Sequence, residues 1–184
     1  AKITGATFPE VLRELGDKVG IVVEDSPAER MQRGQSHRIE EINRASMTWF
    51  QANLRDPQIG ATGREYLNRR GIQQSTVESF QIGVSSPEWD GLLKFLTRKG
   101  FSHSEIMTAG LGSPRVNGNG HYDKFHGRLI FTITDLRKRV VGFGGRVLDD
   151  GTPKYLNSPD TPLFKKGQTL FAFDQAREAI VRIK

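Results

Sequence analysis

The chain has 184 residues and carries 27 Lys and Arg against 21 Asp and Glu, which gives a net charge of +6. This length suits one domain, or one domain with a short appendage. The sequence contains no cysteine, which excludes disulfide bonds and thiolate metal sites and favours a cytoplasmic protein. It has no signal peptide and no apolar run of about 18 residues, so we expect no membrane association.

The positive charge is concentrated in the C-terminal part of the chain. Residues 1–114 hold 14 basic and 14 acidic side chains, whereas residues 115–184 hold 13 basic and 7 acidic ones. A basic part beside a neutral part is typical of a protein with a nucleic-acid-binding face. The alternative interpretation is an ordinary solvated surface.

Helical periodicity dominates the N-terminal part. Residues 8–19 are predicted to form a first helix, and residues 26–54 a longer second one. The second helix begins with a capping box, in which Ser26 is the N-cap residue and Glu29 its partner. Residues 29–41 are almost wholly polar, which indicates an exposed connector rather than core. The buried stripe of this helix is predicted to consist of Ile39, Ile42, Trp49 and Phe50.

Shorter helices follow, each marked by a start or stop signal. Residues 63–70 and 89–99 are each predicted to form a helix that a glycine ends. Capping boxes at residues 75–78 and 102–105 mark the beginnings of two more helices. Residues 81–85 are predicted to form a short strand between them.

Strand signals dominate the C-terminal half. Apolar residues alternate over 129–133 and again over 141–143, and the polar break at 135–138 predicts a hairpin between them. Residues 170–173 are predicted to form a last strand, and Asp174 to cap a final helix. The predicted fold class is therefore α+β, with a helical N-terminal part and a small, mainly antiparallel sheet in the C-terminal half.

Three glycines interrupt the second strand of this hairpin, at positions 142, 144 and 145. Glycine weakens a strand, so a close approach by another backbone or a ligand is one reason for its presence. Cations, a ring and hydrogen-bonding groups surround these glycines, which is typical of a site for a phosphate backbone. Arg128 and Arg146 lie on the two paired strands and can face one groove. The candidate binding residues are Arg128, Arg146, Lys154, Tyr155, Asn157, Ser158 and Lys166.

The residues indicate no self-contained active site. Asp149 and Asp150 are adjacent, and adjacent carboxylates on a strand point to opposite faces, whereas a two-metal site needs convergent acids. The four histidines lack the spacing of metal ligands. We therefore predict no catalytic residue and no metal ligand in this chain.

Dense motifs follow one another within residues 125–167. They are Gly127-Arg128, the run from Val141 to Arg146, the run from Pro153 to Pro159, and Phe164 with Lys166. In this order they resemble the catalytic core of the bacterial replicative DNA primases, the DnaG-type enzymes. Looser likenesses cover most of the chain and include Tyr66-Leu67, Arg70-Gly71, Trp89-Asp90 and Tyr122-Asp123. The departures, at Thr132, Asp160 and residues 171–173, remove no cation.

The resemblance implies a piece of a longer enzyme. Residues 1–36 would be the linker from a missing zinc-binding domain, and residues 37–184 the N-terminal subdomain of the catalytic core, truncated before the toprim domain. The full-length protein would be a DNA-directed RNA polymerase, a nucleotidyltransferase that makes short RNA primers in the primosome during DNA replication. It would use Mg²⁺ in the toprim domain and Zn²⁺ in the zinc-binding domain, and this fragment alone would bind neither and be inactive.

The resemblance also implies partners and residue roles. The partners would be the single-stranded DNA template, the RNA–DNA hybrid and ribonucleoside triphosphates, with the replicative helicase and the single-strand-binding protein reached through missing regions. The cations among the candidates would hold template or triphosphate, and the other candidates would shape that wall of the active-site cleft. Tyr155 can stack on a base or pack on the sheet. The alternative function is a non-catalytic module that binds single-stranded nucleic acid.

Overall fold

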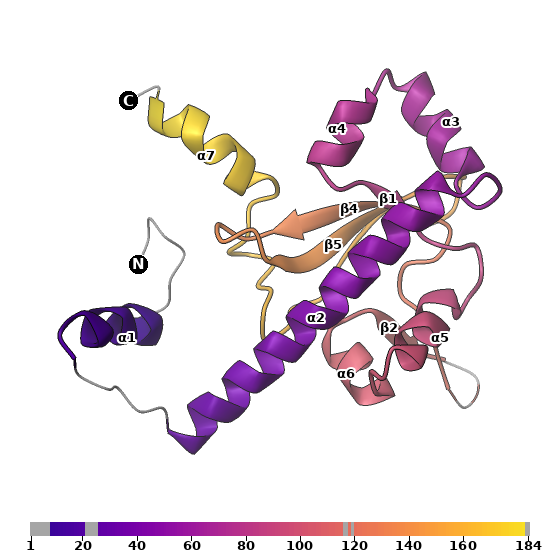
Figure 1. The fold of residues 1–184 in the computed structure, drawn as a ribbon. Helices are drawn as coiled ribbons and strands as arrows, with labels where there is room; N and C mark the ends of the chain where they lie inside the picture. Colours follow the sequence, from indigo (N-terminus) through magenta and orange to yellow (C-terminus); the bar gives the residue numbers. More distant parts are fainter. Residues whose placement is uncertain (1–7, 21–25, 116–117, 119, 183–184) are drawn as a thin grey trace.

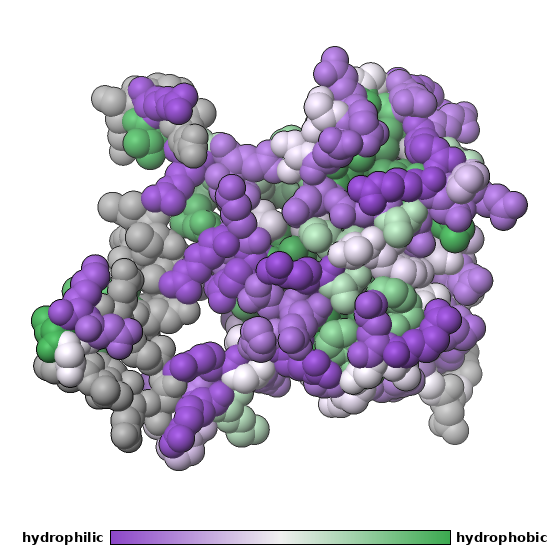
Figure 2. Space-filling view, in the orientation of Figure 1, coloured by the Kyte–Doolittle hydropathy of each residue, from purple (hydrophilic) through white to green (hydrophobic). Residues whose placement is uncertain are grey.

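The computed structural model describes residues 8–20, 26–115, 118 and 120–182. A single long helix, α2 (Pro27–Arg55), crosses the molecule diagonally, and its N-terminal end projects beyond the sheet (Figure 1). With 29 residues, α2 is about 43 Å long at a rise of about 1.5 Å per residue. The surface of the projecting end is mostly hydrophilic (Figure 2), as the polar sequence there predicts. The shorter helix α1 (Phe8–Lys18) lies apart from the sheet on the same side.

The sheet has four strands in the order β1-β4-β5-β6, and every neighbouring pair is antiparallel. The predicted hairpin is confirmed, because β4 and β5 pair directly across the 135–138 break. A separate antiparallel pair, β2 with β3, lies outside this sheet. The predicted α+β class is confirmed as well. The strands are β1 (Gly83–Val84), β2 (Gly112–Pro114), β3 (His121–Asp123), β4 (Arg128–Thr134), β5 (Val140–Val147) and β6 (Tyr155–Asn157).

Helices cover both faces of the sheet (Figure 1). On one face, Ile130 and Phe143 pack with the buried side of α2, α5 and α6. On the other face, Leu129 packs with residues of α3 and α4. No helix in the described ranges is long and apolar enough to cross a membrane. The remaining helices are α3 (Ala61–Arg69), α4 (Gln74–Ser79), α5 (Gly91–Arg98), α6 (His103–Thr108) and α7 (Phe173–Arg182).

The first core is built around the C-terminal half of α2. Ile39, Ile42 and Phe50 are buried there as predicted, whereas Trp49 is only half-buried. The ring of Phe50 meets the ring of Phe143 edge to face, with 5.3 Å between ring centroids. Such aromatic contacts add to the free energy gained by burying the two rings. The long helix is thereby fixed against the middle of the sheet.

The capping predictions have mixed outcomes. The boxes at Ser26 and Ser102 form, each with its glutamate three residues later. The box predicted at residues 75–78 is wrong, because α4 already begins at Gln74 and Ser75 lies inside the helix. The side chain of Gln74 instead donates a hydrogen bond to Glu78, at 2.8 Å. A capping box needs its first residue outside the helix, and here that residue is Gln73.

Two predictions near the C-terminal end are wrong. Residues 170–173 form no strand, because the chain turns at Phe171 and Ala172 and Phe171 packs on the rings of Phe80 and Phe131. A short apolar run cannot be assigned to a strand by periodicity alone, and here Leu170 and Phe171 are exposed. Helix α7 begins at Phe173, so Asp174 lies in its first turn rather than before it.

Asp123 joins the small β2–β3 pair to α5. Its carboxylate is buried and accepts hydrogen bonds from the backbone N–H groups of Leu92 and Leu93, at 2.7 and 2.9 Å. The pKa of Asp123 is raised from 3.8 to about 6, mainly by burial, which outweighs those two N–H groups, with a smaller contribution from the nearby carboxylates of Asp90 and Glu88. The folded chain therefore holds this proton more tightly than the unfolded chain does.

We expect Asp123→Asn to change how stability depends on pH. In the wild type, the stabilisation linked to this proton is complete below about pH 4 and is lost as the pH rises through about 6, which amounts to about 3 kcal/mol. Asparagine cannot titrate, so the stability of the wild type relative to Asp123→Asn should fall by about that amount between pH 4 and pH 7. Urea unfolding of both proteins across this range measures the difference. A difference that stays constant with pH would contradict the buried carboxyl.

Candidate nucleic-acid interface

Arg146 lies between two tyrosine rings on one face of the sheet. The strand register pairs Arg146 with Leu129 of β4 and with Tyr155 of β6, so these side chains leave the sheet on the same side. The guanidinium carbon of Arg146 is 4.7 Å from the ring centroid of Tyr66 and 5.7 Å from that of Tyr155. Rings at these distances attract the cation and fix its orientation. Among the described residues, the guanidinium donates one hydrogen bond, a long one of 3.3 Å to the carbonyl oxygen of Val147.

Two further arginines, at the C-terminal end of α3, lie near the ring of Tyr66. The guanidinium carbons of Arg69 and Arg70 lie 5.7 and 5.4 Å from the Tyr66 ring centroid. None of these three arginines forms an ion pair with a carboxylate of the described chain. We call Tyr66, Arg69, Arg70 and Arg146 the Tyr66 cluster. Its uncompensated positive charge favours an anion, and guanidinium groups match the geometry of phosphate oxygens.

Sequence reasoning did not place Arg69 or Arg70 among the site residues, and it used Tyr66 and Arg70 only as looser family likenesses. A local signal was available, because a tyrosine followed by arginines three and four positions later presents all three side chains on neighbouring parts of a helix. The contact with Arg146 had no such signal, since 80 positions separate it from Tyr66.

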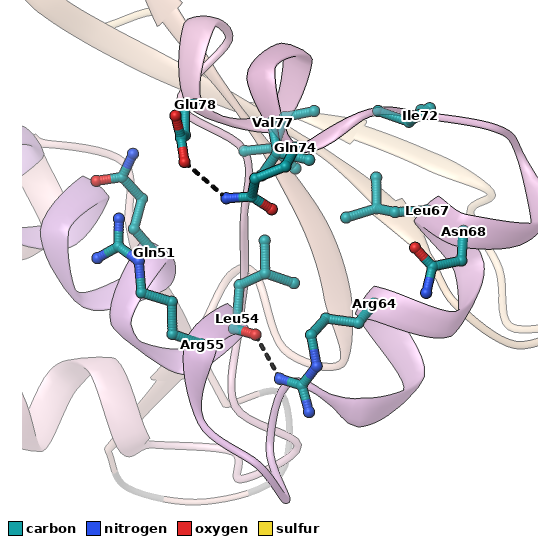
Figure 3. Close-up of a pocket in the computed structure, with 11 residues that line it drawn as sticks. Gln51, Leu54, Arg55, Arg64, Leu67, Asn68, Ile72, Gln74, Val77 and Glu78 are labelled. Atoms are coloured by element: carbon teal, nitrogen blue, oxygen red, sulfur yellow. Dashed lines mark hydrogen bonds between the residues drawn. The ribbon is translucent and has the colours of Figure 1, made fainter.

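Helix α3 is held where it can present Tyr66 by an arginine that caps α2 (Figure 3). The guanidinium of Arg64 donates hydrogen bonds to the carbonyl oxygens of Leu54 and Asp56, both at 2.6 Å, and to that of Pro57 at 2.9 Å. These include carbonyl groups that the end of α2 leaves without partners. A cavity of about 190 Å³ lies beside Arg64 and is lined by side chains of α2, α3 and α4.

Strand β6 and the residue before it carry three exposed members of the predicted set. Tyr155 is 64% exposed, and Lys154 and Asn157 are also exposed. The sequence did not predict this strand, which pairs with the glycine-rich part of β5. A Cβ atom on Gly144 would lie 3.2 Å from the Asn157 side-chain oxygen, and one on Gly145 would lie 2.8 Å from the ring of Phe125. Glycine is therefore present in this strand because neighbouring side chains, rather than a ligand, approach its backbone closely.

Arg128 does not face the same groove as Arg146. The register pairs Arg128 with Val147 and Leu129 with Arg146, and since neighbours along a strand alternate between faces, the two arginines leave opposite faces of the sheet. Arg128 is buried, which lowers its pKa, and its guanidinium donates a hydrogen bond to the carbonyl oxygen of Pro153, at 2.9 Å. This contact ties the loop before Lys154 to β4, so Arg128 is placed to position that loop.

Ser158 and Lys166 lie in different environments. Ser158 is buried, and its hydroxyl oxygen accepts a hydrogen bond from the backbone N–H of Phe143 at 2.9 Å. Its own N–H donates to the Phe143 carbonyl oxygen at 2.8 Å, so Ser158 fastens the end of β6 to β5. Lys166 is exposed in a turn, where its backbone N–H donates to a carboxylate oxygen of Asp160 at 3.0 Å.

Metal binding requires several ligand side chains that converge on one point. Across residues 8–20, 26–115, 118 and 120–182, no three His, Asp or Glu side chains lie close enough together to hold a metal ion. The side chains that converge at the Tyr66 cluster are cations and rings. This surface can therefore hold anions and flat rings, and it lacks the ligands for Mg²⁺ or Zn²⁺.

Comparison with known proteins identifies similar chains. Residues 49–177 match the model of the family described as DNA primase catalytic core, N-terminal domain. The DNA primase of Deinococcus radiodurans is 38% identical over 174 residues, which cover 95% of this chain and 29% of that protein. The Escherichia coli DNA primase is 34% identical and is matched over 30% of its length. The chain thus spans 29% and 30% of the length of these two relatives.

Solved structures show the same likeness in the fold. A DnaG primase catalytic domain bound to single-stranded DNA is 35% identical, with a TM-score of 0.73 over 81% of this chain and 46% of that one. The RNA polymerase domain of Mycobacterium tuberculosis primase DnaG with double-stranded DNA is also 35% identical, with a TM-score of 0.73 over 79% of this chain and 46% of that one. The Aquifex aeolicus primase, with its zinc-binding and RNA polymerase domains, is 29% identical and superimposes over 96% of this chain and 41% of that one, with a TM-score of 0.69.

Proposed function

The chain belongs to the family of DNA primase catalytic core N-terminal domains, and from this premise we propose that it forms the basic wall of a primase active-site cleft. This wall binds the single-stranded DNA template and the incoming ribonucleoside triphosphates during primer synthesis. The observation that carries the proposal is the Arg146 guanidinium, held between Tyr66 and Tyr155 in a cluster with no compensating carboxylate in the described chain.

Each part of this surface has a chemical role toward a nucleic-acid strand. Arg146, oriented by the two rings, donates hydrogen bonds to a phosphate group without first losing side-chain freedom. Lys154, the residue before β6, adds a mobile point charge, and the exposed ring of Tyr155 provides a surface on which an unpaired base stacks. Arg128 and Ser158 hold β6 and the loop before it in place. The wall therefore grips backbone and base without reading the sequence.

Catalysis of nucleotidyl transfer is assigned to other parts of the polypeptide. We place the carboxylates that hold Mg²⁺ in sequence outside this chain, since the described residues contain no suitable set. Residues 1–36 then serve as the connector toward the zinc-binding region, and residues 37–184 as the cleft wall. The RNA–DNA hybrid forms along this wall, and contacts with the helicase and the single-strand-binding protein lie on other domains.

Salt-dependent binding tests the proposed wall. Each phosphate contact releases counterions, so removing one cation should flatten the log–log dependence of the affinity on salt by roughly 0.7 for a single strand. We expect the double variant Arg146→Ala with Lys154→Ala to lose about 1.4 in slope on a labelled oligothymidine, and to lose affinity about equally on a mixed-sequence strand. Fluorescence anisotropy over a series of salt concentrations measures both quantities.

The matched control removes two exposed arginines from the projecting end of α2, Arg30 and Arg33. Arg38 is not suitable for this control, although it lies in the same polar stretch. Its guanidinium bonds to Glu105 of α6 at 2.6 Å and to the carbonyl oxygen of Gly100 at 3.1 Å, so its loss would disturb the domain. If the control loses as much slope and affinity as the Arg146 and Lys154 pair, general positive charge explains the binding and the wall is refuted.

A further inference from the structure

A second basic groove lies on the helical layer that covers the opposite face of the sheet. It has a volume of about 670 Å³ and runs between α5, α6 and the β2–β3 pair. These elements pack on the core that contains Ile130 and Phe143, whereas the Tyr66 cluster shares its face of the sheet with Leu129. The sheet and α5 thus separate the groove from the proposed cleft wall. Its charged and titratable lining is Asp90, Lys94, Arg98, His103, Arg115 and His121.

The charges of this lining are largely uncompensated. Asp90, the one acid among the described lining residues, is paired with Lys94 at 2.9 Å, and the nearby carboxylates of Glu88 and Asp123 also act on Lys94. Arg98 donates from its Nε to the carbonyl oxygen of Lys94 at 3.3 Å, which leaves its two outer nitrogens free of any described carboxylate. The Arg115 side chain forms no ion pair with a described residue either. Arg98 and Arg115 therefore line the groove without an ion pair to a described carboxylate.

The fold also brings two histidines from distant elements to this place. The rings of His103, at the start of α6, and His121, at the start of β3, stand nearly perpendicular with 6.0 Å between their centroids. Imidazole N–H groups donate hydrogen bonds to phosphate oxygens, and protonated imidazole adds charge. Charge counting along the sequence could not find this groove, because residues 1–114 are neutral in sum and the cations gather only in the fold.

We propose that this groove is a second phosphate-binding surface, which holds the backbone of a nucleic-acid strand away from the cleft wall. The nature of the ligand rests on the proposed function. Two guanidinium groups and two imidazoles line this open groove, and a phosphate backbone binds to such groups by charge and hydrogen bonds without base recognition. A strand that passes the cleft wall thereby gains a second point of attachment.

The test compares three double variants of the whole chain on a long labelled oligothymidine: Arg98→Ala with Arg115→Ala, Arg146→Ala with Lys154→Ala, and Arg30→Ala with Arg33→Ala. We expect the first pair to flatten the salt dependence by about 1.4 in log–log slope, because two phosphate contacts are lost. Replacing His103 and His121 together by alanine should weaken binding as well, because two hydrogen-bond donors to phosphate oxygens are lost. Circular dichroism confirms that the variants fold.

Two results would overturn the second surface. One is an unchanged slope for the Arg98 and Arg115 pair while the Arg146 and Lys154 pair loses its slope, which leaves the proposed function intact. The other is an Arg98 and Arg115 double variant that binds the strand as tightly as the wild type but no longer binds polyglutamate. That result would make the groove a site for acidic peptides. If neither of these pairs differs from the Arg30 and Arg33 control, the proposed function fails with it.

Discussion

Replacing Gly83 by alanine is expected to destabilise the domain by about 3 kcal/mol or more. A Cβ atom at this position would lie 2.5 Å from the carbonyl carbon of Phe50, 2.6 Å from its Cβ and 2.7 Å from its carbonyl oxygen. These atoms belong mainly to the backbone of α2, which cannot rotate away as a flexible side chain would. Strand β1 and the long helix must therefore separate, and the aromatic core around Phe50 opens with them. Urea unfolding at neutral pH measures the loss.

Gly34→Ala is the matched control, because no atom outside the helix backbone lies within 4 Å of a Cβ atom there. Gly34 lies inside α2 without interrupting it, so alanine should stabilise the helix by about 0.5–1 kcal/mol. The two substitutions are chemically identical and are expected to have opposite signs. A Gly83→Ala protein as stable as the wild type would show that α2 and β1 do not approach this closely.

Primer synthesis is expected to be absent from this chain and present once the rest of the catalytic core is joined to it. The transfer of nucleotides by polymerases requires convergent carboxylates, and the described residues provide none. In the joined protein, Arg146→Ala should lower the yield of RNA by about tenfold or more, because a charge-assisted hydrogen bond is worth about 1.5–3 kcal/mol. The yield is measured with a single-stranded template, labelled ribonucleotides and magnesium.

Arg30→Ala in the joined protein provides the control, and we expect it to leave the yield of RNA unchanged. RNA made by the chain alone, above a buffer blank, would contradict the division of labour between wall and carboxylates. An inactive joined protein that still binds the template would favour a non-catalytic binding module instead.

The regular elements could largely be predicted from the sequence, because their signals are local. The capping boxes at Ser26 and Ser102 mark helices that form as expected, and the alternation over 129–133 and 141–143 marks the central hairpin. Local signals gave wrong predictions where contacts between distant residues determine the backbone conformation. Phe171, for example, lies in a turn, where its ring packs on the rings of Phe80 and Phe131.

The site was predicted less well than the fold, for a geometric reason. Side chains on a strand alternate between faces, so a shift of one position moves a residue to the other side of the sheet. Arg128 and Arg146 both lie in the hairpin, but the register that separates them cannot be read from composition. The partnership of Arg146 with Tyr66 requires α3 to be docked by Arg64, and nothing in the sequence near Arg146 indicates that.

Photo-crosslinking tests most directly whether a single strand lies along the face of the sheet where Arg146 is held between two tyrosines. An oligonucleotide that contains 5-iododeoxyuridine is bound to the chain and irradiated, and the modified residues are identified by mass spectrometry. We predict adducts on Tyr155, whose ring is 64% exposed beside the Arg146 guanidinium. Adducts on Trp89, which is 53% exposed, with Tyr155 unmodified would contradict this path of the strand.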